Sequence, residues 1–275
     1  MGWLFYFTKI DIVLFMEIKY IDIHSHFNLK QFEGDLDESI KKMHERGVAT
    51  ICVGTDLETS KRAVEIAEKY DFIWATVGMH PTDTKDTFKV EDFEELARNP
   101  KVVAIGECGL DYFRTPKIDV YDHQRENFLA QIRLAQMVHK PLMIHARPSK
   151  GSMDAYEDAL GILQDFDEIR ANFHFFVGST SIAQRALDQG HTMSFDGPIT
   201  FTDEYNEVLR ALPLESIMAE TDSPYAAPEP HRGGRAEPWM VEFVYRKIAE
   251  IRGEDEEEVR IALNENASKF FNILF

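Results

Sequence analysis

Short apolar runs alternate with amphipathic segments along almost the whole chain. The apolar runs are a few residues long and rich in Val, Ile and Phe, which is typical of strands buried on both faces. We therefore predict strands over residues 20–24, 48–54, 72–78, 102–107, 141–145, 171–175, 191–195 and 216–219.

The intervening segments place apolar side chains at helical spacing, as Ala63, Ile66 and Tyr70 do. Gly47 stands where a left-handed residue ends a helix, and Pro238 stands where a helix tolerates proline at its start. Helices are predicted over residues 35–46, 58–70, 90–98, 121–139, 154–165, 182–189, 203–212, 238–251 and 255–271.

Buried strands that are each followed by a helical segment indicate a parallel sheet covered by helices. Eight such strands close into an α/β barrel of the (β/α)8 TIM type. An open, doubly wound sheet is the competing architecture. No linker, repeat or low-complexity segment interrupts the pattern, so we predict one TIM-barrel domain over residues 16–275.

The first fifteen residues stand apart from this pattern. Their aromatic run at 3–7 is interrupted by Lys9 and Asp11, and no basic region precedes it. The segment is too short for a membrane span and poorly built for a signal peptide. We hypothesise that Met16 is the working start and that residues 1–15 are a loose or non-native extension.

The chain is strongly acidic, with a formal net charge of −18. A protein that coats nucleic acid needs a broad basic face, so any phosphate-bearing partner must be held locally. Cys52 and Cys108 lie in or just after apolar runs, and no secretory signal is present. We expect reduced, partly buried thiols and a cytoplasmic protein without a membrane anchor.

Ionisable side chains gather at the carboxyl ends of the predicted strands. His24 and His26 lie two residues apart on one strand and share a face, so they can bind one cation. In a barrel the carboxyl ends converge on one mouth, whereas an open sheet would scatter them along a ridge. The residues at these ends are His24, His26, His80, Glu107, His145, His174 and Asp222.

These residues exceed the ligand set of a single tetrahedral zinc. A carboxylate shared between two nitrogen-rich sets suits a pair of divalent ions roughly 3.5–4 Å apart, which we expect to be Mg²⁺, Mn²⁺ or Zn²⁺. Such ions activate a bridging water for hydrolysis. The expected division is His24, His26 and Asp222 on one ion, His145 and His174 on the other, and Glu107 between them.

Each assignment has a simpler structural alternative. A His-x-His pair on a strand can be two hydrogen-bonded histidines, and Glu107 can be a carboxylate at the edge of the core paired with an arginine. A barrel that gathered all these residues at one end without a ligand would concentrate costly desolvated charge. The combination therefore favours metal binding.

Short motifs surround these residues in a fixed order along nearly the whole chain from Met16. They are Asp22-Ile23-His24-Ser25-His26, Gly78-Met79-His80-Pro81, Gly106-Glu107-Cys108-Gly109-Leu110-Asp111-Tyr112, Ile144-His145, His174-Phe175-Phe176-Val177-Gly178-Ser179, Glu220-Thr221-Asp222-Ser223-Pro224-Tyr225 and Arg232-Gly233-Gly234-Arg235. This ordered set resembles the TatD family of metal-dependent deoxyribonucleases. The resemblance implies a TIM barrel of the amidohydrolase type, two metals on the six ligand positions, and hydrolysis of DNA phosphodiester bonds, with single-stranded or frayed ends as the expected substrate. The family's Arg-Gly-Lys-Arg-Asn-Glu-Pro run is altered here, since Gly234 and Ala236 replace Lys and Asn.

Catalytic and substrate-binding roles follow for several residues. The resemblance places His80 near the substrate phosphate, although its own strand-end backbone is an alternative partner. Besides binding metal, Asp222 is expected to take a proton from the attacking water. Forked hydrogen bonds to phosphate are expected from Arg147, Arg232 and Arg235, and ordinary salt bridges are the alternative.

The leading hypothesis is a hydrolase in which a water between two metals attacks the phosphodiester, with Glu107, Asp222 and His80 as catalytic residues. One alternative keeps the metals and changes the bond: an amidohydrolase-type deacylase or esterase acting on an aminoacyl-tRNA or a small ester. A nuclease needs a cationic groove leading from the metals, which separates these two hypotheses. A second alternative is a non-catalytic, metal-stabilised binding protein, which predicts a closed coordination shell.

Overall fold

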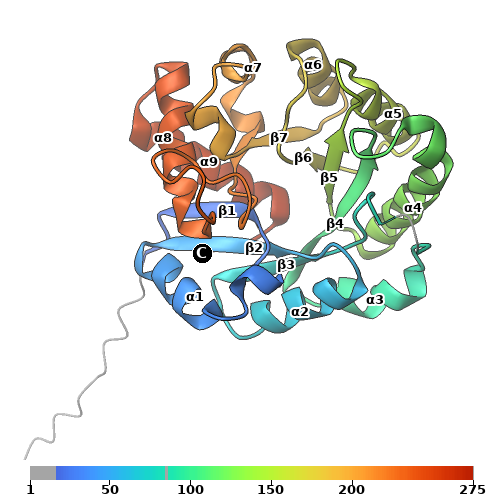
Figure 1. The fold of residues 1–275 in the computed structure, drawn as a ribbon, viewed down its shortest axis with the longest axis horizontal. Coiled ribbons are helices and arrows are strands. Elements are labelled where there is room, and N and C mark those ends of the chain that lie inside the picture. Colours follow the sequence, from blue (N-terminus) through green and yellow to red (C-terminus); the bar gives the residue numbers. More distant parts are fainter. Residues whose placement is uncertain (1–16, 84–85, 275) are drawn as a thin grey trace, which may run out of the picture.

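Eight parallel strands form one sheet in chain order in the computed structural model, which describes residues 17–83 and 86–274 (Figure 1). A parallel bridge between Ser25 and Ser223 links the first strand to the segment after the last, so the sheet is nearly closed. The predicted TIM barrel is confirmed. The strands are β1 (Tyr20–Ser25), β2 (Val48–Val53), β3 (Ile73–Val77), β4 (Val102–Asp111), β5 (Leu142–Arg147), β6 (Ala171–Phe173), β7 (Thr192–Phe195) and β8 (Ile217–Ala219).

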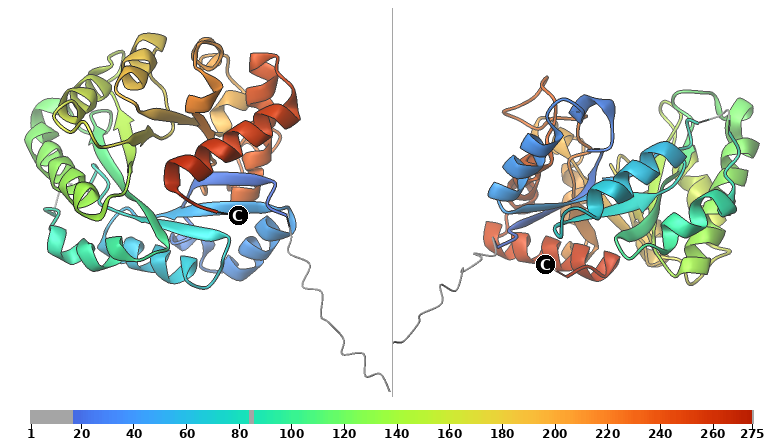
Figure 2. Two further views of the ribbon diagram at one scale, coloured as in Figure 1. Left: turned by 180° about the vertical axis from the view of Figure 1, so that it is seen from behind. Right: turned by 90° about the horizontal axis from the view of Figure 1, so that it is seen from below.

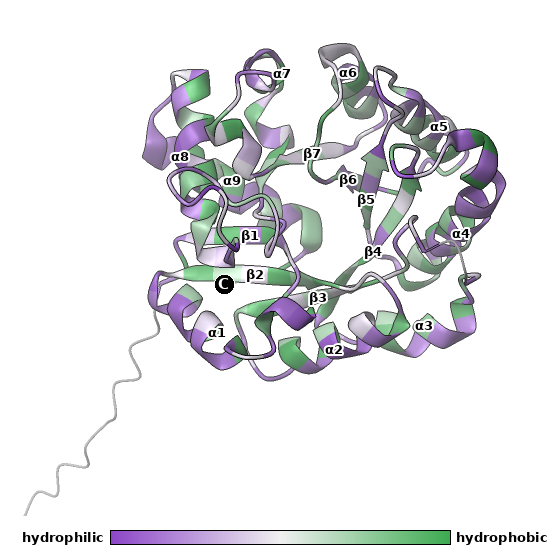
Figure 3. Ribbon diagram, in the orientation of Figure 1, coloured by the Kyte–Doolittle hydropathy of each residue, from purple (hydrophilic) through white to green (hydrophobic). Residues whose placement is uncertain are grey.

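Helices surround the barrel (Figure 1). Figure 3 shows largely hydrophobic strands, whereas hydrophilic and hydrophobic residues alternate along the helices, as expected when one helical face covers a core. The helices are α1 (Leu36–Glu45), α2 (Leu57–Ala67), α3 (Val90–Arg98), α4 (Lys117–Val138), α5 (Asp154–Leu163), α6 (Thr180–Asp188), α7 (Asn206–Ala211), α8 (Val241–Arg252) and α9 (Glu256–Phe271), with 3₁₀ turns η1 (Lys30–Phe32), η2 (Gly197–Thr200), η3 (Leu214–Ser216) and η4 (Pro238–Met240). The prediction for residues 1–15 lies outside the described residues.

The core has two parts. One lies between the strands and the surrounding helices. The other fills the barrel interior, where Ile21, Ile51 and Met218 cluster with Phe270 and Phe271 of α9. Helix α9 crosses one end of the barrel (Figure 2). It packs at the amino ends of the strands and leaves the carboxyl ends open for a site.

Most element boundaries agree with the predictions within a few residues, and three differences are instructive. Strand β4 continues to Asp111 instead of ending at residue 107, because its glycines are accommodated within the sheet: a Cβ at Gly109 would lie 2.2 Å from the His145 carbonyl oxygen. Strand β6 ends at Phe173, because Phe175 has a left-handed φ of 46° that cannot continue a strand. Helix α4 begins at Lys117, directly after Pro116, rather than at residue 121.

Both cysteines are free and buried, as predicted. Burial raises the pKa of the Cys52 thiol to about 12, so this thiol stays protonated at neutral pH. Among the described helices, none has both the length and the apolar character that a membrane span requires.

His191 is a buried histidine remote from the predicted mouth residues. It precedes β7, is 3% exposed, and lies 6.0 Å from the Phe173 ring. Neither ring nitrogen has a hydrogen-bond partner among the described residues. Burial lowers the pKa of His191 to about 4, so the folded protein contains the neutral imidazole.

This burial predicts acid sensitivity. Because the folded-state pKa of His191 lies below the unfolded value of about 6.5, the unfolded chain takes up the proton first as the pH falls. The stability contribution is complete above pH ~6.5 and decreases towards pH 4, by about 2–3 kcal/mol. Urea unfolding from pH 7 to 4.5 should show a smaller loss for His191→Leu than for wild type. His139→Asn, at an exposed left-handed position, is the control, and parallel losses in all three proteins would contradict the prediction.

Candidate functional site

The carboxyl ends of the strands surround a cavity of about 800 Å³. His24 lies behind its lining and is fully buried, with its Nε2 atom 3.2 Å from His26 Nε2. The structure thus brings together all the residues that the sequence placed at the mouth. Those that line the cavity are His26, His80, Glu107, His145, His174 and Asp222.

The buried carboxylate of Glu107 lies between two sets of imidazoles. Its Oε2 atom is 3.5 Å from His24 Nε2 and 3.8 Å from His26 Nε2. Its Oε1 atom faces a second set of nitrogens: His174 Nε2 at 2.9 Å, His145 Nδ1 at 3.0 Å and His80 Nε2 at 3.2 Å. Each carboxylate oxygen of Glu107 therefore faces a different set of imidazole nitrogens.

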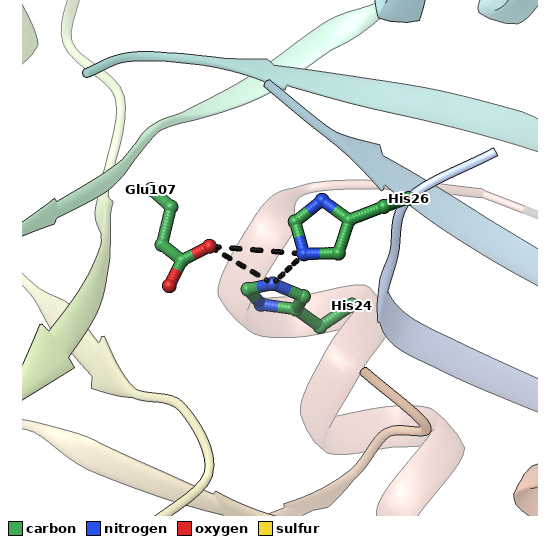
Figure 4. A group of neighbouring side chains, drawn as sticks. All are labelled: His24, His26 and Glu107. Carbon is green, nitrogen blue, oxygen red and sulfur yellow. Dashed lines mark hydrogen bonds and ion pairs between the residues drawn. The ribbon is translucent and has the colours of Figure 1, made fainter. Parts of the chain in front are cut away.

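The first set has the spacing of a tetrahedral cation site. Asp222 Oδ1 completes it, at 3.3 Å from His26 Nε2 and 3.7 Å from His24 Nε2. Four donors at about 2.0–2.1 Å from a Zn²⁺ ion are about 3.3–3.4 Å apart in a tetrahedron. Figure 4 shows the donor atoms of His24, His26 and Glu107 turned towards one another. The donor set therefore fits a divalent cation.

Hydrogen bonds to the outer ring nitrogens indicate which nitrogen can bind a metal. His26 Nδ1 lies 2.9 Å from the Val53 carbonyl oxygen, which only accepts, so Nδ1 carries the proton and Nε2 presents its lone pair. His145 Nε2 lies 3.0 Å from Asp111 Oδ2. Although burial would raise the pKa of Asp111, the hydrogen bond from His145 lowers it to about 2. His145 therefore donates from Nε2 and presents Nδ1 to the site.

His80 has the opposite tautomer. The Thr82 backbone N–H donates to His80 Nδ1 at 3.1 Å, and the Thr82 hydroxyl lies 2.6 Å from the same atom. With Nδ1 accepting, the neutral ring carries its proton on Nε2, and burial lowers the pKa of His80, which favours the neutral form. His80 thus presents a hydrogen-bond donor to the cavity, unlike the metal-type nitrogens of His26 and His145.

Helix α4 positions the His80 segment through buried amides. Gln131 accepts a hydrogen bond from the Met79 N–H at 2.8 Å and donates to the Met79 carbonyl at 3.0 Å. Gln124 donates to the Pro81 carbonyl at 3.0 Å. The residues on both sides of His80 are therefore fixed to the same helix.

The site is electrostatically coupled. Burial alone would raise the pKa of Glu107, but the neighbouring His80 and His174 imidazoles hold it well below its ordinary value. Burial would lower the pKa of His174, but the Glu107 and Glu220 carboxylates hold it well above its ordinary value. Without a cation, protons thus balance the buried carboxylates, and metal binding would release them.

Two residues of the site adopt left-handed backbone conformations, Asp222 with φ 51° and Phe175, directly after His174, with φ 46°. The Asp222 N–H donates to the His24 carbonyl at 2.9 Å, and the Phe175 N–H donates to Glu220 Oε1 at 2.6 Å. Such strained conformations persist where surrounding contacts over-determine them. These contacts fix the directions of Asp222 and His174.

Sequence reasoning missed the carboxylates that hold the site residues in place. Asp22 accepts hydrogen bonds from the backbone N–H groups of His24 and Thr221, which ties β1 to the end of β8. Asp111 orients His145, and Glu220 Oε1 lies 3.4 Å from His174 Nδ1. The available signal was their position: each is an acidic residue within or directly beside an apolar strand.

The predicted phosphate-binding arginines lie in different surroundings. Arg235 forms a two-pronged ion pair with Asp35, at 2.6 and 2.8 Å, and Arg232 stacks at 4.1 Å from the Phe201 ring centroid. Neither is among the described residues that line the cavity, so the substrate role expected for them is not supported by their placement. Arg147 does line the cavity, together with Arg114, which the sequence reasoning missed.

Comparisons with known proteins agree with this geometry. Residues 21–272 match a family model described as TatD related DNase. The uncharacterized metal-dependent hydrolase YabD of Bacillus subtilis is 39% identical over 262 residues, which cover 92% of this chain and 98% of YabD. The 3'-5' ssDNA/RNA exonuclease TatD of Citrobacter rodentium is 33% identical over 269 residues, covering 92% of this chain and 97% of that protein.

A solved structure agrees as well. YJJV, a TatD homolog from Escherichia coli, has a TM-score of 0.85 and 28% sequence identity, covering 94% of this chain and 99% of that one. The chain therefore belongs to the TatD family of metal-dependent hydrolases.

Proposed function

We propose that this protein hydrolyses phosphodiester bonds at the ends of single-stranded DNA with the help of two divalent cations. The observation that carries the proposal is the Glu107 carboxylate, whose two oxygens face two separate sets of nitrogen donors. The exonuclease name of the Citrobacter rodentium relative supports a nucleic acid as the substrate.

The donor sets name the residues that would hold the cations. His24, His26 and Asp222 would hold one, His145 and His174 the other, and Glu107 would contribute an oxygen to each. Bound there, such cations supply a water of lowered pKa and stabilise the charge on phosphoryl oxygens.

His80 would bind the substrate rather than a metal. Its Nε2–H group lines the cavity beside Glu107, and its neutral form persists at neutral pH because burial lowers the pKa. A donor aimed at a phosphoryl oxygen stabilises the transition state more than the ground state, because negative charge grows on that oxygen. In this proposal, His80 Nε2 is the atom that would contact the substrate.

Asp222 would accept the proton of the attacking water. Burial would raise its pKa, but the hydrogen bond with His26 and the nearby His24 imidazole lower it, so Asp222 stays ionised at neutral pH. It lines the cavity, where an ionised carboxylate can accept a proton.

Removal of metal tests the proposal directly. Dialysis against a chelator should abolish cleavage of single-stranded DNA, and Mg²⁺, Mn²⁺ or Zn²⁺ should restore it, with about two ions bound per chain. Elemental analysis and an exonuclease assay provide the measurements. Glu107→Gln is the control for contaminating nuclease. Full activity in a metal-free sample, or in Glu107→Gln, would refute the proposal. A parallel assay with an ester substrate tests the esterase alternative.

The tautomer of His80 makes a second prediction. His80→Ala should retain both metals yet lower kcat by about 10²–10³-fold, because one donor to the developing charge is lost. His80→Gln should recover part of the rate, since its amide can place an N–H near the position of Nε2. For comparison, His174→Gln should contain less metal than wild type, whereas His80→Ala should not. Loss of metal from His80→Ala would make His80 a ligand instead.

Asp111 makes a third prediction. Its Oδ1 atom accepts hydrogen bonds from the Phe113 and Arg114 N–H groups, and its Oδ2 accepts from His145. In Asp111→Asn the amide oxygen would stay with the two N–H groups, so its NH₂ would face His145 Nε2 and force the proton onto Nδ1. In metal titrations, affinity for the ion assigned to His145 and His174 should fall about 10–100-fold. Affinity for the ion assigned to His24, His26 and Asp222 should not change.

The control for Asp111→Asn is Asp35→Asn, the same chemical change at a carboxylate that pairs with Arg235 away from the cavity lining. Equal metal affinities in Asp111→Asn and wild type would show that Asp111 does not set the tautomer of His145.

A further inference from the structure

Two guanidinium groups line the cavity, and one of them stacks against an exposed aromatic ring. Arg114 and Arg147 both line the cavity, and the Arg147 guanidinium lies 4.1 Å from the centroid of the Phe113 ring. Phe113 is 54% exposed. The sheet sets this arrangement, because Asp111, two residues before Phe113, is the register partner of Arg147 across β4 and β5.

Arg147 has no carboxylate partner among the described residues, although the protein has a net charge of −18. Arg235, in contrast, is neutralised by Asp35 at 2.6 Å. The carboxylate that Arg114 approaches is that of Asp111, at 3.9 Å, and the Arg114 side chain is 65% exposed. A half-buried guanidinium held against a ring without a counter-ion is prepared to bind an anion from outside.

The position of Arg147 fits the phosphate next to the reacting one. His145 and Arg147 lie two residues apart on β5, so their side chains share a face and are separated by about 6.5 Å along the strand. This separation is comparable with that of neighbouring phosphates in an extended nucleic-acid strand. A phosphate at the Glu107 and His145 end would place the next one at Arg147.

The number of cationic side chains in the cavity lining limits how long a bound nucleic-acid strand can be. Arg114 and Arg147 are the arginine or lysine residues among the described residues that line the cavity. Because each backbone phosphate is held through its charge, these side chains can neutralise one or two phosphates beyond the reacting one. A long strand would meet the acidic remainder of the protein.

We propose that Phe113, Arg114 and Arg147 form a subsite for the phosphate adjacent to the scissile one, so the preferred substrate is a strand end that carries a second phosphate. This inference rests on the proposed phosphodiesterase function. It gives that function a substrate class, short phosphorylated ends, and assigns a role to Phe113 and Arg114.

Binding at equilibrium tests the subsite without turnover. Calorimetry on the metal-loaded protein should show thymidine 3',5'-bisphosphate binding at least about tenfold more tightly than thymidine 3'- or 5'-monophosphate. In Arg147→Gln this preference should shrink to about twofold. Phe113→Leu should lower bisphosphate affinity about two- to fivefold, because the ring that holds the guanidinium is lost.

Arg170→Gln is the matched control. Arg170 is also an arginine over a phenylalanine, 5.4 Å from the Phe270 ring, but it lies at the amino end of β6, away from the cavity. This variant should keep the wild-type preference. Equal affinities for bisphosphate and monophosphates in wild type, or an undiminished preference in Arg147→Gln, would overturn the subsite.

Hydrolysis separates this inference from the function on which it rests. The dinucleotide TpT and its 5'- and 3'-phosphorylated forms should all be cleaved by the metal-loaded protein, with one phosphorylated form about tenfold better in kcat/KM. Failure to cleave any of them, or single-stranded DNA, would refute the proposed function. Cleavage of all three at equal kcat/KM would overturn the subsite alone.

Discussion

The buried carboxylate of Glu107 is the interaction on which the site depends. A carboxylate and several imidazoles are each costly to remove from water, and each lowers the cost for the other. The shifts in pKa express this mutual dependence: Glu107 is held ionised by His80 and His174, and His174 is held protonated by Glu107 and Glu220. Substituting Glu107 alone would remove the carboxylate that both sets of imidazoles share.

The fold was predictable because its signal is local and repeated. Apolar residues dominate the buried strands, and the site residues lie within or shortly after the carboxyl-terminal halves of β1, β3, β4, β5, β6 and β8. The predicted strand boundaries were wrong where the end of a strand depends on contacts with residues distant in sequence. Strand β4 continues through Gly109 because the adjacent β5 backbone approaches closely, and β6 ends at Phe173 because Phe175 is held left-handed by a contact from Glu220.

The residues of the site were predictable by type, and their roles only in part. His80 and His145 are both histidines at strand ends, yet Thr82 leaves one with an N–H towards the site and Asp111 leaves the other with a lone pair there. The difference lies in what the outer nitrogen contacts, which no residue pattern states. The surroundings of Arg235 were also hidden from the sequence. Its partner Asp35 is 200 residues away in sequence, so the sequence alone suggested that Arg235 was free to bind phosphate.

The two ends of the barrel divide stability from chemistry, as is usual for this architecture. At the amino end, Phe270 and Phe271 of α9 seal an apolar interior. At the carboxyl end, left-handed conformations at Asp222 and Phe175 and a cluster of buried charge oppose folding. Asp22 and Glu220 offset this cost. Asp22 accepts the N–H groups of His24 and Thr221, and Glu220 accepts the Phe175 N–H and the Ser194 hydroxyl. Apolar burial at the amino end therefore stabilises the fold, while the carboxyl end keeps a strained arrangement of donor atoms suited to binding cations.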